Sequence, residues 1–259
     1  MGDRLIGVDI GGTKLSVAVL ENSTLLTARV VSTDTRDYDR LLEQVVHAIR
    51  GAGEALAVGV AVPSVVDFAT GLVRWSGNVP LADVPLRDVL RERLDRPVIV
   101  DNDANCAAFA EAYDDDGELV ARHLVMFTIG TGVGGGIVID GRLYRGATGA
   151  AGKLGHTIVQ AELDKPVAQS DGFPRPGSVE CLAAGRVLTA LCFRHNLRAG
   201  TAIDAAVRGH QGARAAIDLL GRRLGVAIAN AINTFDPDLV VVGAGISGAP
   251  AVAVGDVTG

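Results

Sequence analysis

A short run near the start of the sequence combines an acid, two glycines, a hydroxyl and a lysine. The run Asp9-Ile10-Gly11-Gly12-Thr13-Lys14 directly follows an apolar segment. Backbone N–H groups in such a turn can form a concavity that binds phosphate, because glycine lets the anion approach closely. A glycine pair that only makes a tight turn is the structural alternative. The run is not a Walker A loop, because the spacing differs and we expect a second strand, not a helix, to follow it.

Two further glycine-rich runs lie later in the chain. They are Gly130-Thr131-Gly132-Val133-Gly134-Gly135-Gly136 and Gly243-Ala244-Gly245. Each comes at the end of an apolar segment that is typical of a strand. Three such turns would converge on one ligand if the halves that carry them face each other. The repetition therefore favours phosphate binding over a purely structural role.

A polar cluster, Asp101-Asn102-Asp103-Ala104-Asn105, lies between a predicted strand and a predicted helix. Asp and Asn are good helix N-caps, which is the structural interpretation. A carboxylate in a nucleotide-binding cleft could also orient a substrate hydroxyl and accept its proton during phosphoryl transfer. Both roles can coexist.

Strand and helix patterns position these motifs in two similar halves. The first half predicts strands at 5–10, 15–20, 25–32, 57–62 and 98–100, and helices at 38–50, 86–94 and 104–112. The second half predicts strands at 123–129, 135–139 and 239–242 and an amphipathic helix at 213–235. A long irregular stretch is expected before this helix. Because each half opens with a glycine-turned hairpin, we expect a duplicated α/β unit with a cleft between a domain at 1–115 and a domain at 116–259. The acidic run at 114–118 is interpreted as a solvated loop.

Composition narrows the classes of function. The chain has 259 residues with 48% hydrophobic and 21% charged residues, which is typical of a globular protein. Its net charge of −6 argues against a protein whose task is to bind nucleic acid. We find no signal-peptide pattern and no run long enough to span a membrane, so we expect a cytoplasmic protein. The three cysteines lack paired spacing and are interpreted as reduced thiols.

In order and approximate spacing, these motifs resemble the motif series of the ROK family of bacterial glucokinases, related sugar kinases and repressors. The series also includes Gly152-Lys153-Leu154-Gly155-His156 and Val242-Gly243-Ala244-Gly245-Ile246-Ser247. The resemblance extends from residue 5 to about residue 248. It implies an α/β, two-domain actin-like ATPase (ribonuclease-H-like) fold with an interdomain cleft. It also implies ATP-dependent phosphorylation of a hexose, with glucose 6-phosphate as the first expected product.

The resemblance implies a role for each matching residue. Asp103 would be the catalytic general base on the 6-hydroxyl of the sugar. The sugar would also contact Asn78, Asn102, Lys153, His156 and Glu180. The terminal phosphates of ATP would bind Gly11, Gly12, Thr13 and Lys14, then Gly130, Thr131 and Gly132, while Gly243 and Gly245 would lie against the adenosine. Asp9 would hold Mg²⁺ through water. Asn78 could equally be a turn residue, and His156 a structural one.

The sequence departs from the family pattern at three places. Lys153 stands where the family has a sugar-binding glutamate, which replaces a hydrogen-bond acceptor by a cation with three donors. Residues 169–180 contain none of the family's zinc-binding cysteines, so we expect ATP and Mg²⁺ but no zinc. The Gly/Ala/Val-rich tail at 248–259 stands where relatives continue with helical residues. We expect this tail to lack regular structure and the adenosine side of the site to be reduced.

The leading hypothesis is a kinase that phosphorylates glucose, with fructose, mannose or an N-acetylhexosamine as alternative substrates. One alternative is a sugar-binding regulator of the same family. Such regulators carry a helix-turn-helix before the first phosphate motif, for which Asp9 leaves no room. Another is a catalytically impaired relative, suggested by Lys153 and the short tail. We expect the partners to be a sugar, ATP and further copies of the chain, not nucleic acid or a membrane.

Overall fold

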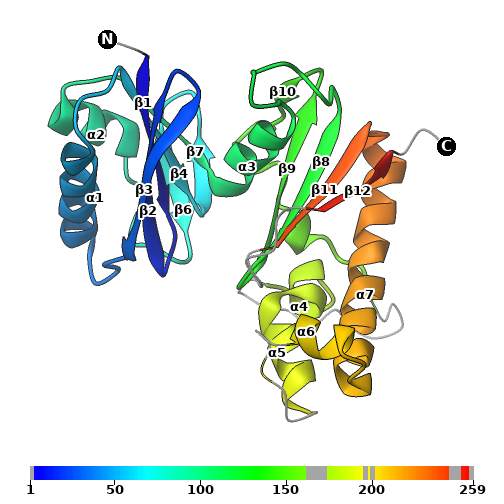
Figure 1. Cartoon of the computed structure of the whole chain (residues 1–259). Helices are drawn as coiled ribbons and strands as arrows, with labels where there is room; N and C mark the ends of the chain where they lie inside the picture. The colour runs from blue at the N-terminus through cyan, green and yellow to red at the C-terminus, as the bar shows by residue number, and fades with distance from the viewer. Residues whose placement is uncertain (1–2, 162–173, 195–197, 199–201, 245–251, 257–259) are drawn as a thin grey trace. The chain divides into compact units, whose positions relative to one another are not determined.

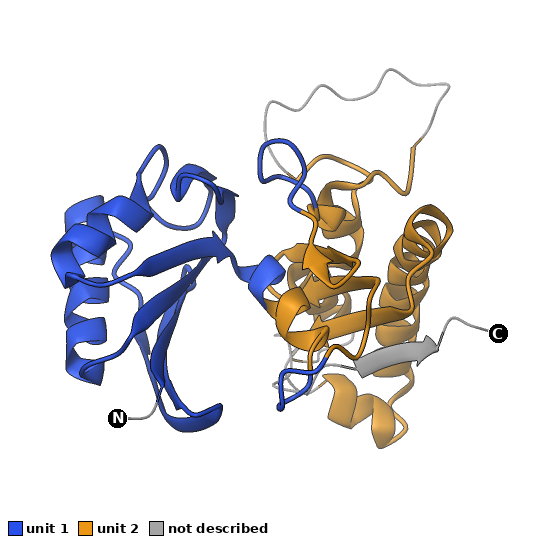
Figure 2. Ribbon diagram, turned by 90° about the horizontal axis from the view of Figure 1, so that it is seen from above, with its two compact units in different colours: residues 1–106, 114–118, 145–151 blue, residues 107–113, 119–144, 152–259 orange. Residues whose placement is uncertain are grey.

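The structure is a computed structural model that describes residues 3–161, 174–194, 198, 202–244 and 252–256. The chain forms two compact units, coloured separately in Figure 2. Unit 1 comprises Met1–Cys106, Asp114–Glu118 and Arg145–Ala151. Unit 2 comprises Ala107–Tyr113, Leu119–Tyr144 and Gly152–Gly259. Short segments of the middle of the sequence therefore belong to the first unit.

Unit 1 is built on a five-stranded sheet in the order β3-β2-β1-β4-β7. Its strands are β1 (Arg4–Ile10), β2 (Lys14–Glu21), β3 (Thr24–Ser32), β4 (Ala57–Val62) and β7 (Val98–Asn102). The first three strands form an antiparallel meander, whereas β1, β4 and β7 are parallel. The β1–β2 turn carries the first glycine motif, and the polar cluster begins at the end of β7. The same sheet therefore positions both motifs.

Helices α1 (Tyr38–Ala52) and α2 (Leu86–Leu94) cover one face of this sheet (Figure 1). Alternate residues of β1 are buried on that face, in agreement with the two-residue period of a strand. The apolar stripe of α1 packs against them, and Asp37 caps the helix by accepting a hydrogen bond from the Arg40 N–H. A small antiparallel pair, β5 (Ser64–Asp67) and β6 (Leu72–Ser76), completes the unit.

Unit 2 repeats this design with the strand order β10-β9-β8-β11-β12. Its strands are β8 (Leu124–Ile129), β9 (Val133–Ile139), β10 (Arg142–Leu143), β11 (Leu239–Ala244) and β12 (Val252–Asp256). As in unit 1, a glycine-turned antiparallel hairpin is followed by a strand parallel to its first member. The two units therefore share a hairpin and a strand order, although the last strand is parallel in unit 1 (β7) and antiparallel in unit 2 (β12).

Helices pack on both faces of the second sheet. On one face, α7 (Gln211–Phe235) and α4 (Val179–Ala183) contact the cluster that contains Val125 and Phe127. On the other, Ala108 of α3 (Asp103–Glu111) and Ala112 pack against Leu124 and Met126. This two-sided burial explains why β8 is almost wholly apolar.

Two expectations about the second half were wrong. The stretch predicted to be irregular contains a 3-10 turn, η1 (Leu154–His156), and helices α4, α5 (Gly185–Phe193) and α6 (Ala202–Val207). The five residues of α4 and the six of α6 are too few for a clear helical period. The tail predicted to lack regular structure forms β12, because antiparallel pairing with β11 supplies hydrogen bonds that no local pattern reveals. None of the helices in the described ranges is both long and apolar enough to cross a membrane.

Candidate active site

The first glycine turn joins β1 to β2 and exposes two backbone donors. The Gly11 N–H is used inside the turn, where it donates to the Lys14 carbonyl at 2.9 Å, and Thr33 Oγ1 donates to the Gly11 carbonyl at 2.7 Å. The N–H groups of Gly12 and Thr13 donate to no other group in the part of the chain that the structure describes. An anion could therefore bind these two amides, beside the exposed Lys14.

Asn78 packs directly on this turn. A Cβ atom at Gly12 would lie 3.1 Å from the Asn78 Cβ and 3.2 Å from its carbonyl oxygen. Glycine at position 12 therefore allows the two segments to touch. The contact places Asn78 next to the phosphate motif, where its exposed side chain can reach a ligand.

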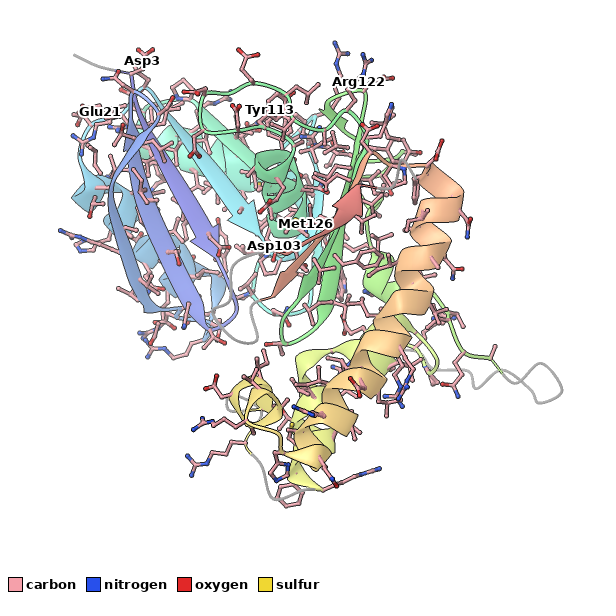
Figure 3. All side chains as sticks on the ribbon, turned by 45° about the vertical axis from the view of Figure 1, so that its right-hand side comes forward. Asp3, Glu21, Asp103, Tyr113, Arg122 and Met126 are labelled. Carbon is pink, nitrogen blue, oxygen red and sulfur yellow. The ribbon has the colours of Figure 1, made fainter. Side chains whose placement is uncertain are left out.

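Asp9 and Asp103, both in unit 1, are near enough for their charges to interact. Partial burial raises the pKa of Asp9, and the charge of Asp103 raises it further. Asp103, labelled in Figure 3, is the first residue of α3. Neighbouring carboxylates favour a divalent cation, and Mg²⁺ in phosphoryl-transfer sites uses one or two carboxylates together with substrate phosphates. The residues present thus fit Mg²⁺.

The raised pKa of Asp9 predicts how Mg²⁺ dependence changes with pH. A metal binds the ionised carboxylate, so protons compete with Mg²⁺ at a higher pH than for an ordinary aspartate. We expect the half-saturating Mg²⁺ concentration to rise about tenfold for each pH unit below the pKa of Asp9. Titrations of activity with Mg²⁺ at a series of pH values test this. In Asp9→Asn this component should be lost, because the amide side chain does not ionise. Identical pH dependence in both proteins would contradict the assignment.

Asn102 holds the Asp103 carboxylate at the start of α3. Its side-chain nitrogen donates to Asp103 Oδ1 at 2.9 Å and to the Ser64 carbonyl at 3.2 Å. Its side-chain oxygen accepts from the N–H groups of Ala104 and Asn105, which makes Asn102 the cap of the helix. The same residue therefore caps α3 and orients the predicted base.

Asp101, which precedes Asn102 and Asp103 in the chain, is buried and only 5% exposed. One of its oxygens accepts from the Asn102 N–H at 2.7 Å and from the Asn105 side chain at 3.0 Å. The other is bound by Arg145, whose Nε and Nη2 lie 2.8 and 2.7 Å away. Sequence reasoning missed Arg145. A buried aspartate signals that some cation is required, but not which one.

The second glycine turn, in unit 2, is held by Glu180. The Gly130 N–H donates to the Gly132 carbonyl, and Glu180 Oε2 accepts from the Val133 N–H at 3.0 Å. A Cβ atom at Gly132 would lie 2.6 Å from Glu180 Oε2, so glycine admits the carboxylate there. Thr131, between the two glycines, is exposed. Glu180, predicted to bind sugar, thus also orders the predicted phosphate turn.

Lys153 directly precedes η1 in the same unit, and His156 is the last residue of η1. Burial lowers the pKa of His156, which the charge of Glu180 opposes and that of Lys153 reinforces. The imidazole is therefore neutral at pH 7. Close packing of this segment on β9 uses Gly155, where a Cβ atom would lie 2.0 Å from the Val133 carbonyl oxygen.

The third motif is only partly within the described residues. Gly243 lies near the end of β11, where a Cβ atom would approach the Met126 side chain to 2.7 Å. Gly245 lies outside the described residues. Across the described ranges, no group of three or more His, Cys, Asp or Glu side chains is arranged to hold a metal ion.

Comparison with known proteins matches residues 5–257 to the ROK family. The chain belongs to the ROK family. An N-acetyl-D-glucosamine kinase of Escherichia coli O6:H1 is 36% identical over 262 residues, which cover 95% of this chain and 85% of the relative. The ROK hexokinase of Thermus thermophilus is 32% identical with a TM-score of 0.74, covering 94% of this chain and 82% of that structure. A ROK glucokinase of Streptomyces griseus, in complex with glucose and AMPPNP, is 29% identical with a TM-score of 0.79, covering 94% and 83%.

These relatives confirm two expectations for this ROK protein. It has the two-domain actin-like ATPase fold, and it is a sugar kinase. Its predicted site residues fall into one set in each unit. Asp9, the first glycine turn, Asn78, Asn102 and Asp103 lie in unit 1, while the second glycine turn, Lys153, His156, Glu180 and Gly243 lie in unit 2.

Proposed function

We propose that this ROK protein transfers the γ-phosphate of ATP to the 6-hydroxyl of a hexose with the gluco configuration, either glucose or N-acetylglucosamine. The observation that carries the proposal is the Asp103 carboxylate, which Asn102 fixes at the start of α3 and whose charge acts on Asp9. A carboxylate in this position can accept the hydroxyl proton as the oxygen attacks phosphorus.

The remaining residues of unit 1 orient the nucleotide. The amides of Gly12 and Thr13 and the ammonium group of Lys14 bind the terminal phosphates. Asp9 holds Mg²⁺, which when bound neutralises charge on the phosphate oxygens. Asp103 Oδ1 receives hydrogen bonds from Asn102 and from the Ala104 N–H, so the plane of the base is set before the sugar binds. Such preorganisation lowers the entropic part of the barrier.

Residues of unit 2 complete the proposed chemistry. Gly130, Thr131 and Gly132 provide a second phosphate-binding turn, and Gly243 provides an adenosine contact. Lys153, neutral His156 and Glu180 bind sugar hydroxyls. Because Glu180 also accepts from the Val133 N–H, a sugar that binds Glu180 would alter the hydrogen bonding of the phosphate turn.

Both proposed sugars have a specific basis. N-acetylglucosamine follows from the curated relatives, which are 34–36% identical over 95% of this chain. Glucose follows from the motif series and from the Streptomyces glucokinase. An ADP-release assay with Mg²⁺ and ATP would compare both with mannose, fructose and N-acetylmannosamine. We expect the highest kcat/KM for one of the two gluco sugars. Sugar binding without turnover on the whole panel would instead support a regulator or an impaired relative.

Replacing Lys153 tests how the sugar side is adapted. We expect Lys153→Glu to raise kcat/KM for glucose about tenfold, because a carboxylate accepts hydrogen bonds from sugar hydroxyls and a charged hydrogen bond contributes about 1.5 kcal/mol or more. Lys153→Gln, which removes the charge but offers one acceptor, should lie between the two. A decrease in both variants would show a site adapted to lysine. Steady-state kinetics on both gluco sugars would measure the effect.

A further inference from the structure

Asp101 is a buried charge whose position depends on its partners. An ionised carboxylate removed from water is costly unless it is paired and hydrogen-bonded. Asp101 is 5% exposed, and its two oxygens together receive four hydrogen bonds. Two of these come from residues that flank the proposed base, Asn102 and Asn105. The other two come from the guanidinium group of Arg145, which supplies the compensating charge.

Arg145 is itself fixed in place from a second side. Its Cζ atom lies 3.7 Å from the centroid of the Phe68 ring, in a cation–π contact. Its side chain is 26% exposed, so the ion pair is shielded from most of the solvent. The planar guanidinium thus lies between an aromatic ring and a carboxylate, an arrangement that the ammonium group of lysine reproduces poorly.

The segment Arg145–Ala151 belongs to unit 1 although the chain on both sides belongs to unit 2. It packs against β5 at Gly149, which has φ of +79°, and a Cβ atom there would lie 1.9 Å from the Val66 carbonyl oxygen. The Ala151 N–H donates to the Arg145 carbonyl at 3.1 Å and closes the segment into a loop. The backbone of this segment therefore places Arg145 next to Asp101.

A continuous set of contacts leads from this arginine to the proposed base. Arg145 binds one oxygen of Asp101, the other accepts from the Asn102 N–H, and the Asn102 side chain donates to Asp103 Oδ1. The charges of these residues also act on one neighbouring side chain, the Cys106 thiol. Burial and the charges of Asp101 and Asp103 raise the pKa of the Cys106 thiol to about 12, and Arg145 opposes this shift.

We propose that Arg145 is a positioning residue for sugar phosphorylation: by neutralising the buried Asp101, it keeps Asn102 and Asn105 in the arrangement that orients Asp103. The role rests on the proposed function of Asp103. It assigns a part in the reaction to a residue outside the glycine motifs and the polar cluster.

Kinetics of four variants test the proposal. In Arg145→Gln we expect kcat to fall about 100-fold, because a misplaced base costs about that factor, with KM for ATP changed less than threefold. Arg145→Lys keeps the charge and should lose about tenfold. Arg74→Gln is the matched control: it removes the 2.7 Å ion pair between Arg74 and Asp67, beside Phe68, and should leave kcat unchanged.

The double variant Arg145→Gln/Asp101→Asn isolates the route through Asp101. Removing the uncompensated carboxylate should restore kcat about tenfold relative to Arg145→Gln alone. If kcat of the double variant instead lies below that of Arg145→Gln, removing the Asp101 charge does not relieve the loss and the proposal is wrong. Loss of Tm in Arg145→Gln without a fall in kcat would also overturn it, since the arginine would then be only structural.

A second readout does not depend on activity. The side-chain amide NMR signals of Asn102 and Asn105 should shift in Arg145→Gln, be close to wild type in Arg145→Lys and be unchanged in Arg74→Gln. Unmoved amides in Arg145→Gln would contradict the proposal even if kcat fell. If the wild-type protein phosphorylates no sugar, the proposed function fails, whereas the amide signals still decide whether Arg145 positions the polar cluster. Should Arg145→Gln not fold, Arg145→Lys and the double variant provide the same comparison.

Discussion

Asp103→Asn is expected to lower kcat for sugar phosphorylation by about 10²–10⁴-fold, the contribution typical of a general base. Asparagine has nearly the same shape and keeps an oxygen that can accept from Asn102 and from the Ala104 N–H. The start of α3 should therefore keep its structure, and binding of an ATP analogue should be nearly intact. Steady-state kinetics, calorimetric titration with the analogue and Tm would measure the three quantities.

Asp88→Asn is the matched control for this substitution. Asp88 also lies in the first turn of a helix of unit 1, α2, and is exposed. The same chemical change there should alter kcat less than twofold. Activity of Asp103→Asn equal to that of the wild type would remove Asp103 from its catalytic role. A joint loss of nucleotide affinity and Tm would show that the carboxylate serves the fold instead.

Gly155→Ala is expected to lower the free energy of unfolding by about 3 kcal/mol, the upper part of the range for overpacking. The added Cβ would lie 2.0 Å from the Val133 carbonyl oxygen, and Val133 is held by pairing with Ile129 and by the hydrogen bond from its N–H to Glu180. The Val133 backbone therefore cannot shift away from the added methyl group without disturbing these interactions. A Tm lower by roughly 6–12 °C should be measurable by calorimetry.

Gly221→Ala makes the same substitution where no atom lies within 4 Å of the added Cβ. Gly221 is exposed on α7, where alanine favours the helix by about 0.5–1 kcal/mol relative to glycine. This control should therefore raise Tm slightly. If both variants behave alike, the contact between Gly155 and Val133 does not constrain the protein as the structure indicates.

Local patterns were sufficient to predict most of the fold. Alternation in β1 and the spacing of apolar residues in α1 depend on neighbours a few positions away, so the sequence contains them directly. The polar cluster was also predicted at the right place, between β7 and α3. The capping role of Asn102 agrees with the N-cap interpretation, whereas its hydrogen bond to Asp103 was not predicted.

Long-range contacts could not be predicted in this way. Arg145 lies 44 residues from Asp101, and Glu180 lies 47 residues from Val133, with no periodic signal to link either pair. The residue type alone does not show whether a glycine binds phosphate or lets a neighbouring segment approach closely. Gly135, part of the second glycine run, lies in β9, where a Cβ atom would meet Leu154 at 2.7 Å. Its role there is packing.

The interrupted course of unit 1 has a consequence for synthesis on the ribosome. All five strands of its main sheet are complete once Asn102 has been made, but Arg145 follows Asp101 by 44 residues. At 5–20 residues per second, Arg145 is synthesised about 2–9 s after the last strand of the sheet. During that interval Arg145, which pairs with Asp101 in the folded protein, has not yet been made. The hydrogen bonds at the start of α3 can therefore reach their final arrangement only after the hairpin of β8 and β9 has been translated. The Asp103 carboxylate, the proposed general base, is therefore fixed in place later than β7, the strand that precedes it.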